Sequence, residues 1–454
     1  MRSHTCGQLN KEHVGKEVTL CGFVDAIRNY GKISFIDVRD RYGMTQLFLS
    51  KGFTEKFGSL RRESVIMVKG LVNARPENQV NKDMSTGEVE LEVKEFDVLN
   101  EVPILPLELD EKVESTEETR LKFRFLDLKK PHMQNNLILR HKANMAIREY
   151  LNKENFLDIE TPILAKSTPE GARDYLVPSR IYPGKFYALP QSPQIFKQLL
   201  MVAGYDRYYQ IVRCFRDEDL RADRQPEFTQ LDTEISFATE EIIFDIYERL
   251  MQHLFRKVMN IDLEIPFQRI THAESIEKYK SDKPDLRKEG EKYKFVWVVD
   301  FPLLEWDEKD NRWNSMHHPF TAPYIEDLTL LKSNPGKVRS RAYDLVLNGF
   351  ELGSGSIRIH DPELQKDMFK ALGIKDEEAN ERFGFLLEAL KFSPPHGGFA
   401  IGLDRLFMIM AGEENIREVI AFPKTKDAQD LMMNAPSIVD KEQLDEVGIE
   451  LKKN

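Results

Sequence analysis

The chain contains 454 residues, of which 41% are hydrophobic and 31% are charged, and its 65 basic and 76 acidic side chains give a formal net charge of −11. This length predicts at least two domains, and the composition is typical of a globular protein that folds in water. An acidic chain is a poor general coat for DNA, so no DNA partner is expected, although a local basic patch could still bind one specific RNA.

Membrane insertion and secretion are not expected either. The sequence has no run of about 18 apolar residues, and its first residues lack the apolar core of a signal peptide. The three cysteines (Cys6, Cys21 and Cys214) form no Cys-x-x-Cys pair, which predicts neither a disulfide framework nor a structural zinc. These features indicate a cytoplasmic protein without a membrane segment.

Residues 1–102 are predicted to form a small antiparallel barrel. Five short strands with alternating apolar and polar residues follow one another between positions 17 and 98, and an OB-fold is the leading candidate. Arg28, Phe35 and Gln46 fall on adjacent strands. An aromatic ring flanked by polar side chains suits an unstacked, single-stranded base. The alternative is that Phe35 belongs to the barrel core.

Residues 103–133, rich in acids and prolines at their start, are predicted to be a linker or hinge. The remaining residues, 134–454, are predicted to form the larger domain. Helical apolar stripes at 139–150 and 243–254 alternate with strands, but not in the regular strand-helix-strand order of a parallel sheet. We therefore expect an antiparallel sheet flanked by helices, and an α+β protein as a whole.

The most informative stretch is 213–232, where two strand-like runs flank a loop crowded with arginines and acids. A surface hairpin would use a tight Asn-Gly or Asp-Gly turn, whereas this loop suits binding of a polyanion. Phe228, Gln230, Asp232 and Glu234 share one face of the second strand because side chains alternate. A polar row on a central strand is costly unless it binds something.

Two further stretches carry candidate chemistry. Residues 397–405 form a glycine-rich strand that ends on Arg405 at the start of a helix, where anions are favoured. Residues 343–358 combine the acids Asp344 and Glu351 with glycines and Arg358. Neither a P-loop nor a Rossmann glycine pattern occurs, so a nucleotide would have to bind elsewhere.

The stretch 213–232 resembles motif 2 of the class II aminoacyl-tRNA synthetases, in the form found in bacterial-type aspartyl-tRNA synthetases. Residues 397–405 resemble motif 3 and residues 153–162 resemble motif 1, which implies a homodimer. The resemblance covers nearly the whole chain, with one departure. Residues 283–287 run almost directly into the apolar strand at 295–299, so the insertion domain that bacterial-type enzymes carry between motifs 2 and 3 is expected to be absent.

The resemblance implies that ATP and Mg²⁺ bind in the larger domain. Arg216 would hold the α-phosphate, Arg405 the γ-phosphate, and Phe228 would stack on adenine. The implied catalytic residues are Arg216, Glu351 and Arg405, and the implied Mg²⁺ ligands are Asp344 and Glu351. The implied ATP set is Arg216, Asp217, Glu218, Gln225, Phe228, Glu351, Gly402, Leu403, Asp404 and Arg405.

The resemblance further implies that L-aspartate is the amino acid. Arg358 and Lys197 would hold its side-chain carboxylate, and Glu170 and Asp232 its α-ammonium group. His317 would lie on a loop that closes over it. The implied aspartate set is Glu170, Gln194, Ile195, Phe196, Lys197, Arg216, Asp232, His317 and Arg358.

The implied RNA partner is tRNA(Asp), whose anticodon would contact Arg28, Phe35 and Gln46, with Asn81 and Glu92 as further candidates. tRNA(Asn) is a second candidate, because Gly31 has no side chain with which to exclude a wrong anticodon base. Two alternative functions stay open at this point. One is an asparaginyl- or lysyl-tRNA synthetase, and the other is a synthetase-like RNA-binding protein without catalysis.

Overall fold

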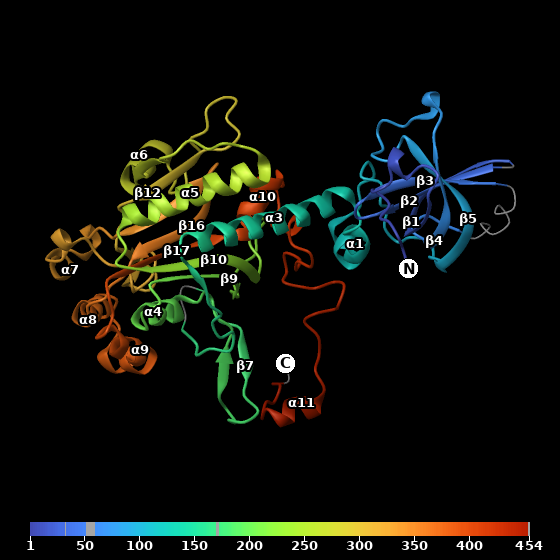
Figure 1. The fold of residues 1–454 in the computed structure, drawn as a ribbon. Helices are drawn as coiled ribbons and strands as arrows, with labels where there is room; N and C mark the ends of the chain where they lie inside the picture. Colours follow the sequence, from blue (N-terminus) through green and yellow to red (C-terminus); the bar gives the residue numbers. More distant parts are fainter. Residues whose placement is uncertain (32, 51–59, 169–171, 453–454) are drawn as a thin grey trace. The chain divides into compact units, whose positions relative to one another are not determined.

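The computed structural model describes residues 1–31, 33–50, 60–168 and 172–452. The chain divides into two compact units, Met1–Ser115 and Thr116–Asn454 (Figure 1). The boundary falls within the stretch predicted as a linker, and residues 116–133 lie in the second unit, where they form its first short helices. None of the helices in the described parts of the chain is both long and apolar enough to cross a membrane.

The first unit is the small closed barrel that the strand pattern predicts. Its strands are β1 (Glu17–Tyr30), β2 (Ile33–Asp40), β3 (Gly43–Leu49), β4 (Val65–Ala74) and β5 (Val89–Asn100), and they close in the order β1-β2-β3-β5-β4. Short 3-10 turns lie at Lys11–His13 and Glu77–Gln79. Alternate residues such as Val18, Leu20, Ile36 and Val38 fill the interior. Phe35 points away from that interior, because its neighbours Ser34 and Ile36 are the buried ones.

The second unit is built on an eight-stranded sheet in the order β11-β12-β15-β16-β17-β10-β9-β6. The strands are β6 (Leu157–Asp158), β9 (Arg207–Phe215), β10 (Glu227–Ser236), β11 (Gln268–Thr271), β12 (Phe295–Val299), β15 (Ala342–Leu347), β16 (Phe350–Ile357) and β17 (His396–Gly402). Two hairpins lie outside it, β7 (Leu176–Pro178) with β8 (Phe186–Ala188), and β13 (Leu304–Asp307) with β14 (Arg312–Ser315).

The predicted antiparallel arrangement holds for every inner pair of this sheet, but the outermost pairs differ. β11 pairs with β12, and β6 with β9, in parallel. A helix lies in each of these connections, as a parallel pair needs a long crossover rather than a tight turn. The stretch that contains Asp344 and Glu351 forms the β15–β16 hairpin, since Asn348 and Gly349 have φ of 54° and 82° and form the two-residue turn that suits twisted strands.

Helices cover both faces of this sheet (Figure 1). α3 (Pro131–Lys153), α5 (Glu240–Met259) and α10 (Leu403–Ala411) pack with Leu231, Phe399 and Ile401 in the main core. α4 (Gln194–Val202), α8 (Pro362–Ala371) and α9 (Asp376–Leu390) form a separate apolar cluster around Phe320. The shorter helices are α1 (Glu117–Lys122), α2 (Arg124–Asp127), α6 (His272–Tyr279), α7 (Leu330–Ser333) and α11 (Lys441–Glu446), with 3-10 turns at Ile325–Asp327, Pro335–Lys337 and Ile416–Glu418.

α5 illustrates why these segments become helices. Ile243, Tyr247, Leu250 and Leu254 recur at helical spacing and are fully buried. Thr239 caps its start by accepting a hydrogen bond from the Ile242 backbone, and Asn260 ends it in the left-handed conformation. This helix and α3 bury Leu231 and its neighbours on one face of the sheet, so the polar row of β10 points to the other face.

Candidate active site

A cavity of about 350 Å³ opens beside α4, on the sheet face opposite α3 and α5. Strands β10, β16 and β17 form its floor, and the loop of the β9–β10 hairpin and the start of α10 contribute to its wall. Most of the predicted site residues meet here. Those lining the cavity are Gln194, Lys197, Arg216, Glu218, Gln225, Phe228, Asp232, His317, Glu351, Arg358, Gly402, Asp404 and Arg405.

Five predicted residues do not line this cavity. Ile195 packs in the apolar cluster behind α4, and Leu403 lies in the main core. Phe196, Asp217 and Asp344 are also absent from the cavity wall. Glu170 lies outside the described residues.

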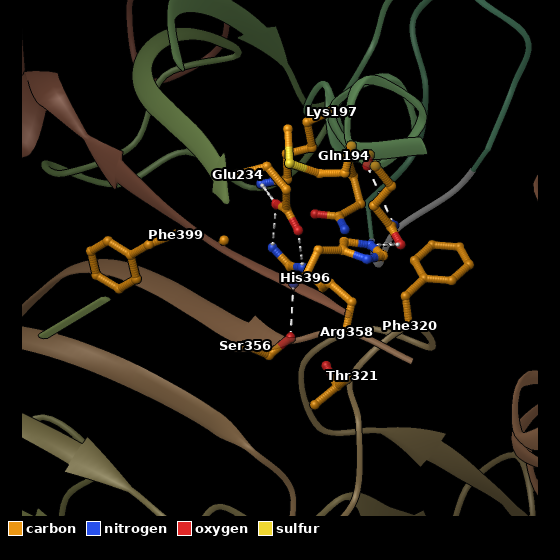
Figure 2. Close-up of polar contacts among 12 residues, drawn as sticks. Gln194, Lys197, Glu234, Phe320, Thr321, Ser356, Arg358, His396 and Phe399 are labelled. Carbon is orange, nitrogen blue, oxygen red and sulfur yellow. Dashed lines mark hydrogen bonds and ion pairs between the residues drawn. The ribbon is translucent and has the colours of Figure 1, made fainter. Parts of the chain in front are cut away.

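One end of the cavity holds four buried charges. The Nζ of Lys197 lies 2.6 Å from Asp232 Oδ1 and 3.4 Å from Glu234 Oε2. Arg358 donates from Nε to Glu234 Oε1 at 3.0 Å and from Nη1 to Ser356 Oγ at 2.8 Å (Figure 2). All four charged side chains are at most 2% exposed. Charges this deeply buried are tolerated only when paired, so each depends on the others.

The two acids of this cluster respond differently to their surroundings. Burial raises the pKa of Asp232 to about 6, although Lys197 opposes the rise. Burial would also raise the pKa of Glu234, but Arg358 and Lys197 together bring it below its ordinary value. Glu234 therefore carries the negative charge that balances the two cations, whereas Asp232 can still accept a hydrogen bond from another partner. Its Oδ2 is buried without a hydrogen-bond partner.

The surroundings of His318 leave a second hydrogen bond unsatisfied at the same end. Burial and the positive charge of Arg358 lower the pKa of His318 well below its ordinary value, so the ring is neutral. The backbone N–H of Phe320 donates to its Nδ1 at 3.2 Å, and Arg358 contacts its Nε2. A neutral imidazole has one acceptor nitrogen, so it cannot accept from both donors. An anion entering the cavity would supply the missing acceptor.

The other end of the cavity holds cations that are neutralised by the chain's own acids. Arg405 donates to Asp223 Oδ2 at 3.0 Å and contacts the Glu351 carbonyl. Arg224 lies 3.3 Å from Glu218. The guanidinium carbon of Arg216 sits 5.1 Å from the centre of the Phe228 ring. The Nε atoms of Arg216 and Arg405 are buried without partners, as expected of groups that await a polyanion.

Asp344 and Glu351 could hold a divalent cation beside this end. Burial and the negative charge of Asp344 raise the pKa of Glu351. His317 donates from Nε2 to Asp344 at 3.2 Å, and this contact holds the pKa of His317 above its ordinary value despite burial. Within the described residues, no group of three or more metal-ligating side chains is present. Two repelling carboxylates fit Mg²⁺, which takes its remaining oxygens from phosphate and water.

Two of the predicted ATP residues have their polar atoms engaged by the protein itself. The amide of Gln225 accepts from the Lys424 backbone N–H at 2.7 Å and donates to the Lys424 carbonyl at 3.0 Å. Asp404 accepts from the Thr229 N–H at 2.7 Å and also from Arg140. Both side chains therefore hold neighbouring elements in place.

Sequence reasoning did not select several residues that the cavity contains. Asp223 and Ile416 line the end that holds Arg216 and Arg405, and His318 and Ser354 line the other. Glu234 does not line the cavity but belongs to its buried charge cluster, and the sequence placed it in the polar row without selecting it as a site residue. It follows Asp232 by two positions on β10 and so shares its face, a signal that was available in the sequence.

The barrel unit presents a separate cluster. Arg28 donates to both oxygens of Asp37, at 2.6 and 2.8 Å, and to Gln46 at 3.2 Å. The Phe35 ring lies 6.1 Å from the Tyr30 ring and 5.7 Å from the Phe48 ring. Polar groups in fixed orientation beside outward-facing aromatic rings suit a nucleobase. The alternative that Phe35 is a core residue is wrong, because it lies outside the barrel core.

Comparison with known proteins agrees with this division of the chain. Residues 116–426 match the family described as "tRNA synthetases class II (D, K and N)", and residues 18–99 match "OB-fold nucleic acid binding domain". The fold and the cavity thus define a class II synthetase with an appended nucleic-acid-binding barrel. Within that class, the chain belongs to the D, K and N family.

Curated relatives span the chain almost completely. The aspartate–tRNA(Asp/Asn) ligase of Caldanaerobacter subterraneus is 45% identical over 99% of this chain and 98% of its own length. The aspartate–tRNA ligase of Ruminiclostridium cellulolyticum is 42% identical over 100% and 98%. The first alignment spans 581 positions against 454 residues here, so the relative carries a long segment that this chain lacks, as the sequence predicts for the insertion domain.

Solved structures share the fold at low sequence identity. Asparaginyl-tRNA synthetase from Pyrococcus horikoshii, complexed with asparaginyl-adenylate, has a TM-score of 0.77 at 23% identity and covers 93% of this chain and 98% of its own. Aspartyl-tRNA synthetase from Entamoeba histolytica has a TM-score of 0.72 at 24% identity, covering 92% and 91%. These similarities establish the architecture of both units.

Proposed function

We propose that this protein is an aspartate–tRNA ligase that activates L-aspartate with ATP and transfers it to the 3′ end of tRNA(Asp). The single observation that carries the choice of amino acid is the buried pair of cations, Lys197 and Arg358, beside the neutral His318. These groups together offer a carboxylate two positive charges and further N–H donors. The full-length relatives named aspartate–tRNA ligases support the same substrate.

The cavity accommodates the three charged groups of aspartate separately. Its side-chain carboxylate would accept hydrogen bonds from Arg358, Lys197 and His318, and so would supply the acceptor that Arg358 and His318 lack. Its α-ammonium group would donate to the unpartnered Oδ2 of Asp232. Its α-carboxylate would then face Arg216 and the nucleotide. Asparagine would bring a neutral amide, whose NH2 group would face the N–H donors of Arg358, Lys197 and His318 where an acceptor is needed, a large penalty, and lysine would place a third cation beside them.

The first chemical step is in-line attack of the α-carboxylate oxygen on the α-phosphorus of ATP. The bond to the bridging oxygen breaks, pyrophosphate leaves, and aspartyl-adenylate remains. Arg216 would neutralise the α-phosphate and Arg405 the departing pyrophosphate, while Phe228 would orient adenine by stacking. Catalysis of this kind is mainly positioning and charge stabilisation. Mg²⁺ held by Asp344 and Glu351 would supply further positive charge to the phosphates.

In the second step, the terminal ribose 3′-hydroxyl of the tRNA attacks the aspartyl carbonyl carbon, and AMP leaves. The proposed anticodon contacts are Arg28, Phe35 and Gln46 on the barrel, where Phe35 offers an outward-facing ring. tRNA(Asn) is the second candidate substrate, favoured by relatives named for both tRNAs. Charging of the two purified tRNAs side by side tests it. We place this activity in the cytoplasm.

We also propose that the protein works as a homodimer. β6 is an edge strand of the sheet, and apolar side chains on and near it are exposed. Leu157 is 50% and Leu164 51% exposed, and Met145 on α3 is 55% exposed. An edge strand with apolar neighbours is a template for association. Light scattering of the wild type and of Leu164→Glu would test this, with a monomeric wild type as the contrary result.

Pyrophosphate exchange into ATP, measured with aspartate, asparagine and lysine in separate reactions, tests the proposed activity directly. We expect exchange with aspartate alone. Exchange with asparagine or lysine instead would favour the corresponding synthetase. Absence of exchange with all three, in protein that still binds tRNA, would favour an RNA-binding protein without catalysis.

A further inference from the structure

The loop of the β9–β10 hairpin, residues 216–226, has little internal support. Two backbone hydrogen bonds lie within the loop among those described: the Arg216 N–H donates to the Pro226 carbonyl at 2.9 Å and closes its base, and the Arg224 N–H donates to the Arg221 carbonyl at 3.2 Å. Asp219, Arg221 and Ala222 are exposed. A charged loop of this length would sample many conformations if nothing else held it. In the proposed function it carries Arg216 at one end and leads into Phe228 at the other, so its order matters for ATP binding.

A segment that follows α10 supplies further support. This segment, residues 415–424, contains the 3-10 turn Ile416–Glu418. The Ile416 N–H donates to the Ala222 carbonyl at 3.1 Å, and Ile416 itself lines the cavity. Lys424 exchanges two hydrogen bonds with the Gln225 amide, at 2.7 and 3.0 Å, and its Nζ lies 3.3 Å from Glu227. The 415–424 segment therefore holds the loop at two points.

The opposite side of the 415–424 segment is held by α1 and α2. Arg124, which opens α2, donates to the carbonyl of Arg417 at 2.5 Å, of Ile420 at 2.9 Å and of Ala421 at 3.0 Å. Arg124 is 2% exposed, and it also pairs with Asp127 at 2.7 Å. A buried guanidinium that satisfies several backbone carbonyls fixes their geometry, because each carbonyl would otherwise be left unpaired.

A second arginine reinforces this attachment. Arg120 of α1 pairs with both oxygens of Glu418, at 3.0 and 2.6 Å. Arg140 of α3 then donates to the Val419 carbonyl at 3.2 Å and to Thr229 Oγ1 at 3.0 Å, and it also contacts Asp404. Thr229 follows Phe228, and Asp404 precedes Arg405. Arg140 therefore links the 415–424 segment to the residues next to Phe228 and Arg405, the two proposed nucleotide contacts.

We propose that Arg124 is a positioning residue for ATP: it fixes the 415–424 segment, which in turn holds the hairpin loop that carries Arg216 and leads to Phe228. Arg124 itself does not line the cavity. The inference rests on the proposed function in so far as ATP binds at the nucleotide end of this cavity. Among the described residues, the polar partners of the Lys197, Asp232 and Arg358 side chains at the amino-acid end are one another, Glu234, Ser356 and His318, and none of them belongs to the 415–424 segment.

The test is the effect of Arg124→Lys on pyrophosphate exchange in the full-length enzyme. Lysine keeps the charge but cannot bond to three carbonyls and Asp127 at once. We expect the KM for ATP to rise about tenfold or more, since small displacements of positioning groups are costly, while the KM for aspartate stays within about twofold. A purely structural role would lower the melting temperature and the active fraction and leave both KM values unchanged.

Because a buried arginine can be needed for folding, Glu418→Gln serves as a second variant, with Glu240→Gln as its matched control. Glu418 and Glu240 each bind one arginine through both oxygens and are 18% and 21% exposed, but Glu240 pairs with Arg341, outside the cavity wall. Glu418→Gln should raise the KM for ATP, and Glu240→Gln should not. An unchanged KM for ATP in folded Glu418→Gln, or an equal rise in both variants, overturns the proposal.

Amide hydrogen exchange gives a readout that does not depend on the proposed activity. Residues 216–227 should exchange at least about tenfold faster in Glu418→Gln than in the wild type, while the α5 amides should keep their protection. If the wild type shows no aspartate-dependent exchange of pyrophosphate, the proposed function fails, and this measurement still decides whether the 415–424 segment orders the loop. Unchanged protection of residues 216–227 would refute that.

Discussion

The side chains of Lys197 and Asp232 are already paired, at 2.6 Å, at one end of the cavity. Lys197 comes from α4 and Asp232 from β10, and both are at most 2% exposed. Because Glu234 and Arg358 complete the cluster, the cavity presents two buried cations balanced by two buried acids. A ligand with both a carboxylate and an ammonium group can bind here by adding partners to this cluster without removing any.

Arg358→Lys should lower kcat/KM for aspartate by about 100-fold or more, because lysine keeps the charge but loses the planar fork that contacts Glu234, Ser356 and His318 together. The KM for ATP should stay close to the wild-type value. Pyrophosphate exchange at varied aspartate and varied ATP measures both. The control is Arg269→Lys, whose arginine pairs with Glu241 on the surface. Wild-type selectivity for aspartate in Arg358→Lys would mean that the carboxylate is recognised elsewhere.

The pH dependence should report on Asp232. Burial raises its pKa from 3.8 to about 6, so below about pH 6 the carboxyl is protonated and accepts the α-ammonium group poorly. We expect kcat/KM for aspartate in pyrophosphate exchange to rise as the pH increases through about 6 and then to level off. The raised pKa also means that this group's contribution to the free energy of unfolding decreases as the pH rises from about 4 to 6. A profile that is flat between pH 5 and 7.5 would contradict this assignment.

Gly398→Ala should disrupt the cluster of Lys197, Asp232, Glu234 and Arg358 by displacing Glu234. An added Cβ would lie 1.8 Å from Glu234 Oε2 and 2.4 Å from the Thr233 carbonyl, so Glu234 would have to leave its place beside Arg358. We expect a loss of roughly 1–3 kcal/mol of stability together with a large loss of aspartate activation. Gly384→Ala is the control, because nothing lies within 4 Å of its added Cβ and it should stabilise α9 slightly. Thermal melting and exchange assays distinguish the two.

Phe228→Leu should raise the KM for ATP about tenfold, because the stacking surface for adenine and the contact with Arg216 are worth about 1–1.5 kcal/mol. The KM for aspartate should not change, since Phe228 lies at the nucleotide end. Phe228→Tyr keeps the ring and should behave like the wild type. Equal ATP affinities for the leucine and tyrosine variants would show that adenine binds without this ring.

Phe35→Ala should weaken tRNA charging by about 1–3 kcal/mol, the usual value of one base stacked on an aromatic ring. Pyrophosphate exchange, which needs no tRNA, should continue at the wild-type rate. Because Phe35 lies outside the barrel core, the melting temperature of the Phe35→Ala protein should stay close to that of the wild type. Equal losses in charging and exchange would mean that the substitution damages the fold and not the tRNA contact.

Local patterns allowed much of the site to be predicted. The alternation on β10 places Phe228, Gln230 and Asp232 on one face, and all three line the cavity. The glycine-rich strand before Arg405 likewise predicts a close approach to a ligand, and β17 lies beside β10 as that requires. By contrast, no local pattern indicates that Asp223 pairs with Arg405, because 182 residues separate them.

The sequence by itself determined the classes of residue and their faces: a barrel of alternating strands, a polar row on a central strand, and arginines and acids at motif spacing. These follow from side-chain periodicity, which is a property of neighbours along the chain. Only the tertiary structure decided which charges meet. The raised pKa of Asp232, the neutral His318 and the support of the hairpin loop by Arg124 all depend on burial and on contacts between distant segments, which arise only when the sheet and its helices close around them.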